Sequence, residues 1–307
     1  MGRVLVAGPR SFCAGVVRAI DIVEKLLERH GPPVYVRHEI VHNVHVVRDL
    51  ESRGAVFVES EEEVPEGALV VLSAHGVAPR VYEKCAERGL RVVDAVCPLV
   101  SKVHAEARRY AARGYKIALV GHAGHVEVEG TMGEAPDSIV LVETPEDALG
   151  LELEEGERLA YLTQTTLSLD DTGEVVSALR ERAPDLVGPP SADICYATQN
   201  RQDAVKRICE EATLVLVVGS QTSSNANRLV EVARSRGAEA HLIDDESDLE
   251  SAWLEGHETV GLTAGASSPD ILVERVVARL ADLGFDRRED VEIAREDVFF
   301  RLPPELR

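Results

Sequence analysis

The fold is decided by a unit that is plainest at residues 97–125, CPLVSKVHAEARRYAARGYKIALVGHAGH. A cysteine opens the unit, and the stretch that follows, 98–113, has the apolar spacing of an amphipathic helix. Ile117 to Val120 is a continuous apolar run, typical of a strand buried on both faces, and it ends in small polar residues. Alternation of helix and buried strand predicts an α/β module with a largely parallel sheet.

The same order of elements occurs three times along the chain. Cys13, Cys97 and Cys195 each precede a helical stretch, at 14–29, 98–113 and 196–211. A strand with a polar ending follows each helix, and then a second helix, an acidic stretch and another strand with a polar ending. The spacings of the cysteines, 97 − 13 = 84 and 195 − 97 = 98 residues, lie on the scale of whole domains.

We therefore predict three similar α/β domains with mainly parallel sheets around a pseudo-threefold axis. The domains are 14–97, 98–194, and 195–284 together with 1–13, because the N-terminal segment can supply the strand and the cysteine that the third copy lacks. Residues 285–307 form a C-terminal tail outside the repeat. Ligands of open α/β sheets bind beyond the carboxyl ends of the strands, so we expect the polar strand endings to face a shared central cleft.

Composition excludes several classes of partner. The 307 residues include 33 Lys and Arg against 54 Asp and Glu, a formal charge of −21, which disfavours nucleic acid and anionic membrane surfaces. Apolar runs fall short of the roughly 18 residues that a transmembrane helix needs. The start of the chain lacks the pattern of a secretory signal, so we expect a cytoplasmic protein.

The five cysteines divide into two groups. An odd number of cysteines in a reducing compartment argues against a disulfide framework. Cys13, Cys97 and Cys195 precede helices, where the helix dipole favours the thiolate, and three thiolates suit zinc or an iron–sulfur cluster. Cys85 and Cys209 lie inside helical stretches at no equivalent point, and we expect them to be inert.

Histidines, a carboxylate and small polar groups follow the predicted strands. His42, His75 and His125 suit either zinc or a phosphate group, as ligands or as donors. Glu127 could relay a proton, or it could simply favour a helix start. Hydroxyl and amide groups near helix starts suit phosphate oxygens, although capping alone also favours them there, and these are Thr165, Thr166, Ser223, Ser224, Asn225, Ser267 and Ser268.

Eight motifs resemble those of the 4-hydroxy-3-methylbut-2-enyl diphosphate reductase family, and the resemblance runs from Val4 to about Leu283. The motifs are FCAGV (12–16), RHEIVHN (37–43), SAHGV (73–77), DAVCPLV (94–100), GHAGHVEVEGT (121–131), TQTTLS (163–168), DICYAT (193–198) and TAGASSPD (263–270). The resemblance implies a three-domain trefoil around an oxygen-sensitive 4Fe–4S cluster. It also implies reductive dehydroxylation of (E)-4-hydroxy-3-methylbut-2-enyl diphosphate to isopentenyl and dimethylallyl diphosphate, the last step of the methylerythritol phosphate, or non-mevalonate, route to isoprenoid precursors.

The resemblance also assigns roles to residues of this chain. It implies that one 4Fe–4S cluster per chain is ligated by Cys13, Cys97 and Cys195, with one iron left open for the substrate hydroxyl. Glu127, assisted by Thr165, would deliver the proton that lets this hydroxyl leave as water. Reduced ferredoxin or flavodoxin would supply the electrons. The substrate diphosphate would be bound by His42, His75, His125, Ser223, Ser224, Asn225 and Ser267.

Two other functions compete with this interpretation. The three thiols or the histidines could hold zinc in a hydrolase, and such a protein would be colourless with about one zinc per chain. A non-enzymatic electron carrier or small-molecule binding protein could hold iron as well, but it would be indifferent to the substitution Glu127→Gln.

Overall fold

The computed structural model describes residues 2–307, which separate into two compact units. Unit 1 comprises the chain up to Val17 together with His42–Asp49 and Tyr196–Phe299. Unit 2 comprises Arg18–Val41, Leu50–Cys195 and Phe300–Arg307. The first helix, α1 (Ala14–His30), begins in unit 1 and continues into unit 2.

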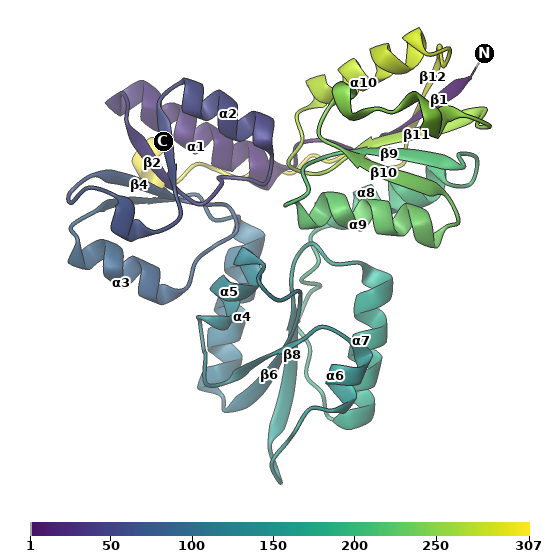
Figure 1. Ribbon diagram of the computed structural model, residues 1–307. Coiled ribbons are helices and arrows are strands. Elements are labelled where there is room, and N and C mark those ends of the chain that lie inside the picture. The colour runs from purple at the N-terminus through teal and green to yellow at the C-terminus, as the bar shows by residue number, and fades with distance from the viewer. Residues whose placement is uncertain (1) are drawn as a thin grey trace. The chain divides into compact units, whose positions relative to one another are not determined.

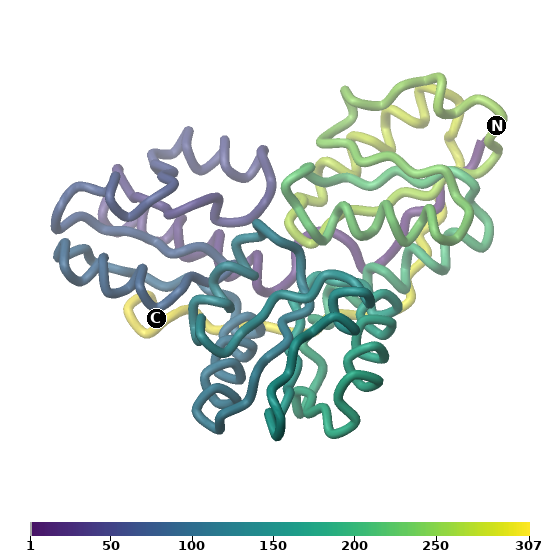
Figure 2. The backbone as a smooth tube through the Cα atoms, turned by 60° about the horizontal axis from the view of Figure 1, so that its bottom comes forward, coloured from purple at the N-terminus to yellow at the C-terminus, as the bar shows by residue number. Residues whose placement is uncertain are grey.

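A five-stranded sheet forms the centre of unit 1 (Figure 1). Its strands are parallel and lie in the order β10 (Glu239–Ile243), β9 (Leu214–Val218), β11 (Thr259–Ala264), β1 (Arg3–Gly8) and β12 (Arg287–Glu292). The N-terminal strand therefore pairs with segments more than 250 residues away, with Val4 opposite Val260 and Arg288. Figure 2 shows the purple N-terminal segment beside the green and yellow chain of this unit.

Helices cover both faces of this sheet. Val4 and Val6 of β1 pack in a core with α10 (Asp270–Asp282), whereas Leu5 and Ala7 pack in a second core with α8 (Tyr196–Ile208) and α9 (Ser224–Ser235). Successive side chains of a strand point to opposite faces, so two separate cores require an unbroken apolar run, which residues 4–7 of β1 supply. The short helix α2 (Val44–Ser52) begins in unit 1 as well.

Unit 2 contains two further parallel sheets. The four-stranded sheet has the order β3 (Ala55–Val58), β2 (Val34–Arg37), β4 (Leu69–Leu72) and β5 (Arg91–Asp94). The three-stranded sheet has the order β7 (Ile139–Val142), β6 (Tyr115–Val120) and β8 (Arg158–Thr163). The remaining helices of this unit are α3 (Pro79–Glu87), α4 (Pro98–Ala112), α5 (Val126–Met132), α6 (Pro145–Leu149) and α7 (Leu169–Arg182).

The predicted α/β class with parallel sheets is confirmed, and the helices after the three cysteines begin at Ala14, Pro98 and Tyr196, as expected. One element was not expected. The sequence predicts that residues 285–307 form a tail outside the repeat, yet β12 lies within this segment and pairs with β1 at the edge of the five-stranded sheet. The domain boundaries themselves stay a prediction.

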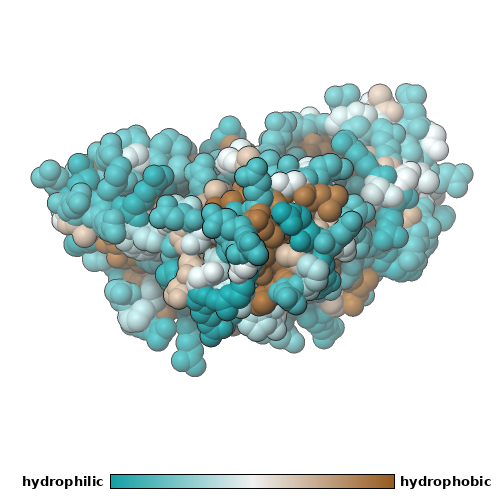
Figure 3. Space-filling model, turned by 90° about the horizontal axis from the view of Figure 1, so that it is seen from below, coloured by the Kyte–Doolittle hydropathy of each residue, from teal (hydrophilic) through white to brown (hydrophobic). Residues whose placement is uncertain are grey.

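The surface agrees with the strongly charged composition. On the face drawn in Figure 3, hydrophilic residues predominate and apolar residues gather in patches near its middle. Within residues 2–307, no helix has the length and apolar character required to cross a membrane.

Candidate active site

The three cysteines predicted to bind metal occupy equivalent places in the structure. Cys13 directly precedes α1, Cys97 is the N-cap of α4, and Cys195 directly precedes α8. All three are partly exposed, and none of the chain's five cysteines, each of which the structure describes, forms a disulfide. A thiol at a helix start is stabilised as the thiolate, so the donor set fits a soft metal group such as an iron–sulfur cluster.

The backbone of each cysteine is held by the same kind of hydrogen bond. The N–H of Cys97 donates to Ala74 O, just after β4, at 2.9 Å, and that of Cys195 donates to Thr165 O, just after β8, at 3.0 Å. The N–H of Cys13 donates to Ala266 O, just after β11, at 3.2 Å. A carboxyl-terminal strand loop thus fixes the position of each cysteine, and the repeat is visible in this bond as well as in the sequence.

The cysteines are divided between the two units. Cys13 belongs to unit 1, whereas Cys97 and Cys195 belong to unit 2. Over the part of the chain that the structure describes, no three His, Cys, Asp or Glu residues are grouped closely enough to hold a metal ion. The other candidate residues are likewise divided between the two units.

Unit 1 gathers neutral donors around Cys13. Ala266, whose carbonyl binds Cys13, donates its own N–H to Asn225 Oδ1 at 2.8 Å. The neighbouring Ser267 hydroxyl donates to the backbone oxygen of His42 at 2.9 Å and lies 3.5 Å from the Ser223 hydroxyl.

Ser223 and Ser224 lie at the start of helix α9. Ser223 is the N-cap of α9, and its hydroxyl accepts a hydrogen bond from Ala226 N. Ser224, which is partly exposed, is the first residue of that helix. The structure thus brings His42, Ser223, Ser224, Asn225 and Ser267 together at the carboxyl ends of β9 and β11, where the N-terminus of α9 favours an anion.

Unit 2 gathers Glu127 and Thr165 beside Cys195. Glu127 lies in the first turn of α5 and is 3% exposed. One carboxylate oxygen, Oε1, accepts the backbone N–H of Thr165 at 2.6 Å, and Oε2 accepts the Thr165 hydroxyl at 3.0 Å. Thr165 O in turn accepts the Cys195 N–H, so one residue links the carboxylate to a predicted metal ligand.

The environment of Glu127 changes its acidity. Burial raises the pKa of Glu127 to about 7, the Asp193 carboxylate acts in the same direction, and the two hydrogen bonds from Thr165 oppose the rise. A carboxyl group with a pKa near neutrality holds a proton that it can release, which is the property required of a general acid.

His125 and His75 lie next to one another in unit 2. His125 is the N-cap of α5, and its Nδ1 accepts the Glu127 N–H at 3.2 Å. This bond requires a lone pair on Nδ1, so Nε2 carries the ring proton and can donate it to an anion. The ring of His75 lies edge-on to that of His125, with centroids 6.3 Å apart.

The turn that carries His75 is closely packed. Gly76 has a φ of +78°, and a Cβ at this position would come within 2.9 Å of the His104 ring. His104 is buried on α4, and its Nδ1 lies 2.7 Å from a Glu134 oxygen. A glycine is needed at position 76 both for its backbone conformation and for the space that His104 occupies.

Sequence reasoning missed an ion pair between a partly exposed lysine and a buried carboxylate that acts on Glu127. Lys102 of α4 binds Ser191 O at 2.7 Å, Ala192 O at 2.9 Å and Asp193 Oδ1 at 3.1 Å. The side chain of Asp193 is fully buried, and its other oxygen accepts Thr163 N at 3.1 Å. Burial raises the pKa of Asp193 to about 6 against the opposing effect of Lys102. Asp193 stands two residues before Cys195, and this was the only signal available in the sequence.

Comparison with known proteins agrees with the motifs. The family model described as LytB protein matches residues 4–281. The 4-hydroxy-3-methylbut-2-enyl diphosphate reductase of Acidothermus cellulolyticus is 60% identical over 99% of this chain and 90% of its own length. The enzyme of the same name from Mycolicibacterium paratuberculosis is 58% identical over 99% of this chain and 92% of its own length.

Two solved structures that resemble this chain are reductases of the same kind. The E-1-hydroxy-2-methyl-but-2-enyl-4-diphosphate reductase from Plasmodium falciparum matches with a TM-score of 0.97 and 39% identity, over 99% of this chain and 96% of that one. A structure of (E)-4-hydroxy-3-methyl-but-2-enyl diphosphate reductase, the terminal enzyme of the non-mevalonate pathway, matches with a TM-score of 0.64 and 32% identity, over 92% of this chain and 100% of that one. The chain therefore belongs to the LytB family, whose relatives here are named 4-hydroxy-3-methylbut-2-enyl diphosphate reductases, as its motifs predicted.

Proposed function

We propose that this chain reduces (E)-4-hydroxy-3-methylbut-2-enyl diphosphate to isopentenyl and dimethylallyl diphosphate, the terminal step of the non-mevalonate pathway. In this reaction the C4–O bond breaks, and the oxygen leaves as water. Two electrons and two protons enter, one proton on the leaving oxygen and one on carbon. Identity of 60% over 99% of the chain supports the assignment. The observation that carries the chemistry is the buried Glu127, bonded to Thr165 and through it to Cys195.

Membership of this family implies an iron–sulfur cofactor, and we propose that it is one 4Fe–4S cluster per chain held by Cys13, Cys97 and Cys195. When bound, such a group would supply single electrons and a Lewis-acidic iron. Support comes from the equivalent helix-start positions of the three thiols and from the equivalent backbone hydrogen bonds that hold them. Cys85 is buried and Cys209 follows α8 without an equivalent bond to a strand loop, so neither is included.

Glu127 is the proposed source of the proton that the leaving oxygen takes up. Its raised pKa keeps a large fraction of the carboxyl group protonated near neutral pH, because burial disfavours the charged form. Thr165 orients the group with two hydrogen bonds, one from its backbone and one from its hydroxyl. The Thr165 hydroxyl can also accept a hydrogen bond from the protonated carboxyl, so Thr165 can bond both charge states of Glu127.

The diphosphate is assigned to neutral donors and histidines. In unit 1 these are the groups around the start of α9, namely His42, Ser223, Ser224, Asn225 and Ser267. In unit 2 they are His75 and His125, the second with its proton on Nε2. Hydroxyls, amides and a helix start bind phosphate without lysine, which reconciles a small anionic substrate with a net charge of −21.

The physiological partners follow from the same proposal. The reaction consumes two electrons, and the proposed cluster would take them up one at a time, so we propose the one-electron donors reduced ferredoxin or flavodoxin. We further propose that the protein acts in the cytoplasm, where a reducing environment preserves thiolate ligands.

Anaerobic iron and sulfide analysis, combined with turnover of the allylic diphosphate, tests the proposal. We expect about four iron and four sulfide per chain, with broad absorption near roughly 400 nm and release of both products. Cys13→Ala, Cys97→Ala and Cys195→Ala should lose iron, whereas the matched control Cys209→Ala should keep it. About one zinc per chain in a colourless protein would support a hydrolase instead. Iron with full activity in Glu127→Gln would refute the proton role, and iron without turnover in the unaltered protein would support an electron carrier.

A further inference from the structure

One arginine outside the proposed catalytic set is completely buried. Arg201, on α8, has no exposed side-chain surface and is the largest of the fully buried side chains among the described residues. Arginine is almost never fully buried unless its charge is paired and its donors are bonded. A buried guanidinium on this helix therefore calls for a reason beyond packing.

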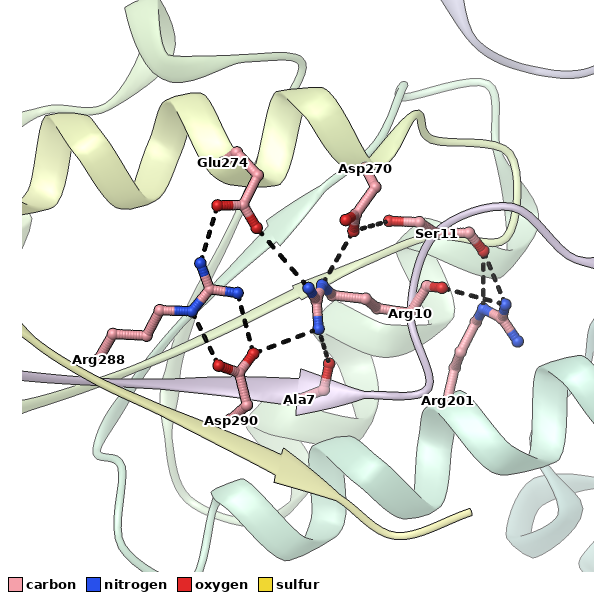
Figure 4. Close-up of polar contacts among 8 residues, drawn as sticks. All are labelled: Ala7, Arg10, Ser11, Arg201, Asp270, Glu274, Arg288 and Asp290. Atoms are coloured by element: carbon pink, nitrogen blue, oxygen red, sulfur yellow. Dashed lines mark hydrogen bonds and ion pairs between the residues drawn. The ribbon is translucent and has the colours of Figure 1, made fainter. Parts of the chain in front are cut away.

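Three of the six Arg201 hydrogen bonds go to the segment before Cys13. Nη2 donates to Ser11 O at 2.7 Å and to Arg10 O at 3.4 Å, and Nε donates to Ser11 O at 3.2 Å. Figure 4 shows the guanidinium aimed at these two carbonyl groups, in the loop that follows β1. Nη1 donates to Ala197 O at 2.9 Å, one turn earlier in α8.

The charge of Arg201 is balanced from the C-terminal segment. Glu296 Oε1 lies 2.9 Å from Nη1 and Oε2 lies 3.3 Å from Nη2, and the Glu296 side chain is only 13% exposed. Glu296 also accepts a hydrogen bond from Asn200 at 3.1 Å. Glu296 belongs to the segment 285–307, which the sequence predicts to be a tail outside the repeat, yet it pairs with the buried charge of Arg201.

The turn at residues 10–13, which Arg201 bonds, is strained and leads directly to Cys13, a predicted metal ligand. Ser11 has a φ of +59°, a left-handed conformation that is costly for a residue with a side chain. Its hydroxyl donates to Asp270 at 3.0 Å, and Arg10 pairs with the same carboxylate, as Figure 4 shows. Two residues later, the Cys13 N–H reaches Ala266 O. A strained turn persists only where its surroundings hold it, and Arg201 supplies three of the bonds that do so.

We propose that Arg201, neutralised by Glu296, is a positioning residue that holds the 10–13 turn so that the Cys13 thiolate is placed for metal binding. Arginine suits this role because one planar fork bonds three carbonyls and a carboxylate at once, which the point charge of lysine cannot do. The role of Arg201 in holding the turn follows from the geometry of unit 1 alone, whereas its role in metal binding rests on the proposed function.

Amide hydrogen exchange on the full-length protein without iron tests the positional claim. The variants are Arg201→Lys, which keeps the charge, and the milder Glu296→Gln, which keeps the shape. We expect the Cys13 amide to exchange about tenfold faster or more, since loss of one charge-assisted hydrogen bond is worth that factor, while amides of α9 and α10 keep their rates. Arg234→Gln is the matched control, because Arg234 lies in the same unit and bonds a backbone oxygen, that of Ala240, far from the 10–13 turn. An unchanged Cys13 rate, or a uniform increase across unit 1, would overturn the proposal.

Iron release from the reconstituted protein tests the claim about metal. With a chelator under anaerobic conditions, both Arg201→Lys and Glu296→Gln should lose iron several-fold faster than the unaltered protein and Arg234→Gln. Equal release rates would refute a role for Arg201 in metal retention. A wild-type protein that takes up no iron would instead refute the proposed function, and the exchange experiment would still decide whether Arg201 holds the turn.

Discussion

Replacing Glu127 by glutamine should abolish most turnover and at the same time stabilise the protein. Glutamine has the shape of the protonated carboxyl, so it can accept the Thr165 N–H through its oxygen and donate its amide to the Thr165 hydroxyl. It cannot release a proton. Loss of a positioned general acid typically lowers the rate by a factor of about 10²–10⁴.

The stability change follows from the raised pKa. Burial raises the pKa of Glu127 from 4.5 to about 7, so between these values the folded protein holds a proton that the unfolded chain releases. The stabilising contribution is therefore fully present below pH 4.5 and is lost as the pH rises through about 7. A shift of about 2.5 pKa units corresponds to about 3 kcal/mol. Glutamine does not titrate, so the variant should avoid this loss.

Urea unfolding followed by circular dichroism, under anaerobic conditions, measures the effect. We expect Glu127→Gln to exceed the unaltered protein in unfolding free energy by about 3 kcal/mol at pH 8 and by less than about 1 kcal/mol at pH 5. Glu129→Gln is the matched control, because Glu129 is two residues further along α5 and exposed. If the unfolding free energies of Glu127→Gln and the unaltered protein differ by the same amount at pH 5 and pH 8, burial does not raise the pKa of Glu127 as argued. A variant that is less stable than the unaltered protein at pH 8 would refute that argument as well. Retained turnover would refute the acid role separately.

Three further substitutions test other parts of the site. Thr165→Val removes the hydroxyl that lowers the pKa of Glu127, so the pH above which kcat/KM falls should move upward, and a profile that stays fixed or moves down would contradict this. Lys102→Met leaves the buried Asp193 without its cation and should lower the unfolding free energy at pH 8 by about 3 kcal/mol. That loss should shrink below pH 6 as Asp193 takes up a proton. The control variant Lys206→Met should change little, because the side chain of its partner Asp203 is exposed, and equal effects of the two variants would refute the argument. Gly76→Ala would push a Cβ against His104 and displace His75, raising KM about tenfold in steady-state assays. Gly89→Ala has a similar φ of +62° and open space around its Cβ, so it should leave KM unchanged, and matching KM values for the two would count against the steric explanation.

Local patterns were sufficient to locate the elements that carry the site. The helices after Cys13, Cys97 and Cys195 begin where the apolar spacing places them, because helix periodicity and N-terminal punctuation are properties of neighbouring residues. The strand predicted at Ile117 to Val120 lies within β6 and ends at the same residue, because a strand covered on both faces needs an unbroken apolar run. β12 was missed for the opposite reason: its residues RREDVE are charged and exposed, as suits the edge of a sheet.

The partners of polar groups could not be read from the sequence in the same way. Arg201 meets Ser11 across 190 residues and Glu296 across 95, and Lys102 meets Asp193 across 91. An arginine or lysine in a helix usually extends its charge to solvent, so the sequence alone favoured no special role for either. Only the tertiary structure shows that Arg201 and Asp193 are buried and which groups bond them.

The sequence by itself determined the α/β class, the threefold order of elements, the family and the identity of the candidate residues, because these depend on short contiguous motifs. The tertiary structure decided their chemical state. It buries Glu127 against Thr165 so that its pKa rises to about 7, gives each of the three cysteines a strand-loop carbonyl, and closes the Cys13 turn with a buried arginine. Acidity and position depend on desolvation and on neighbours distant in the chain, and folding alone brings those together.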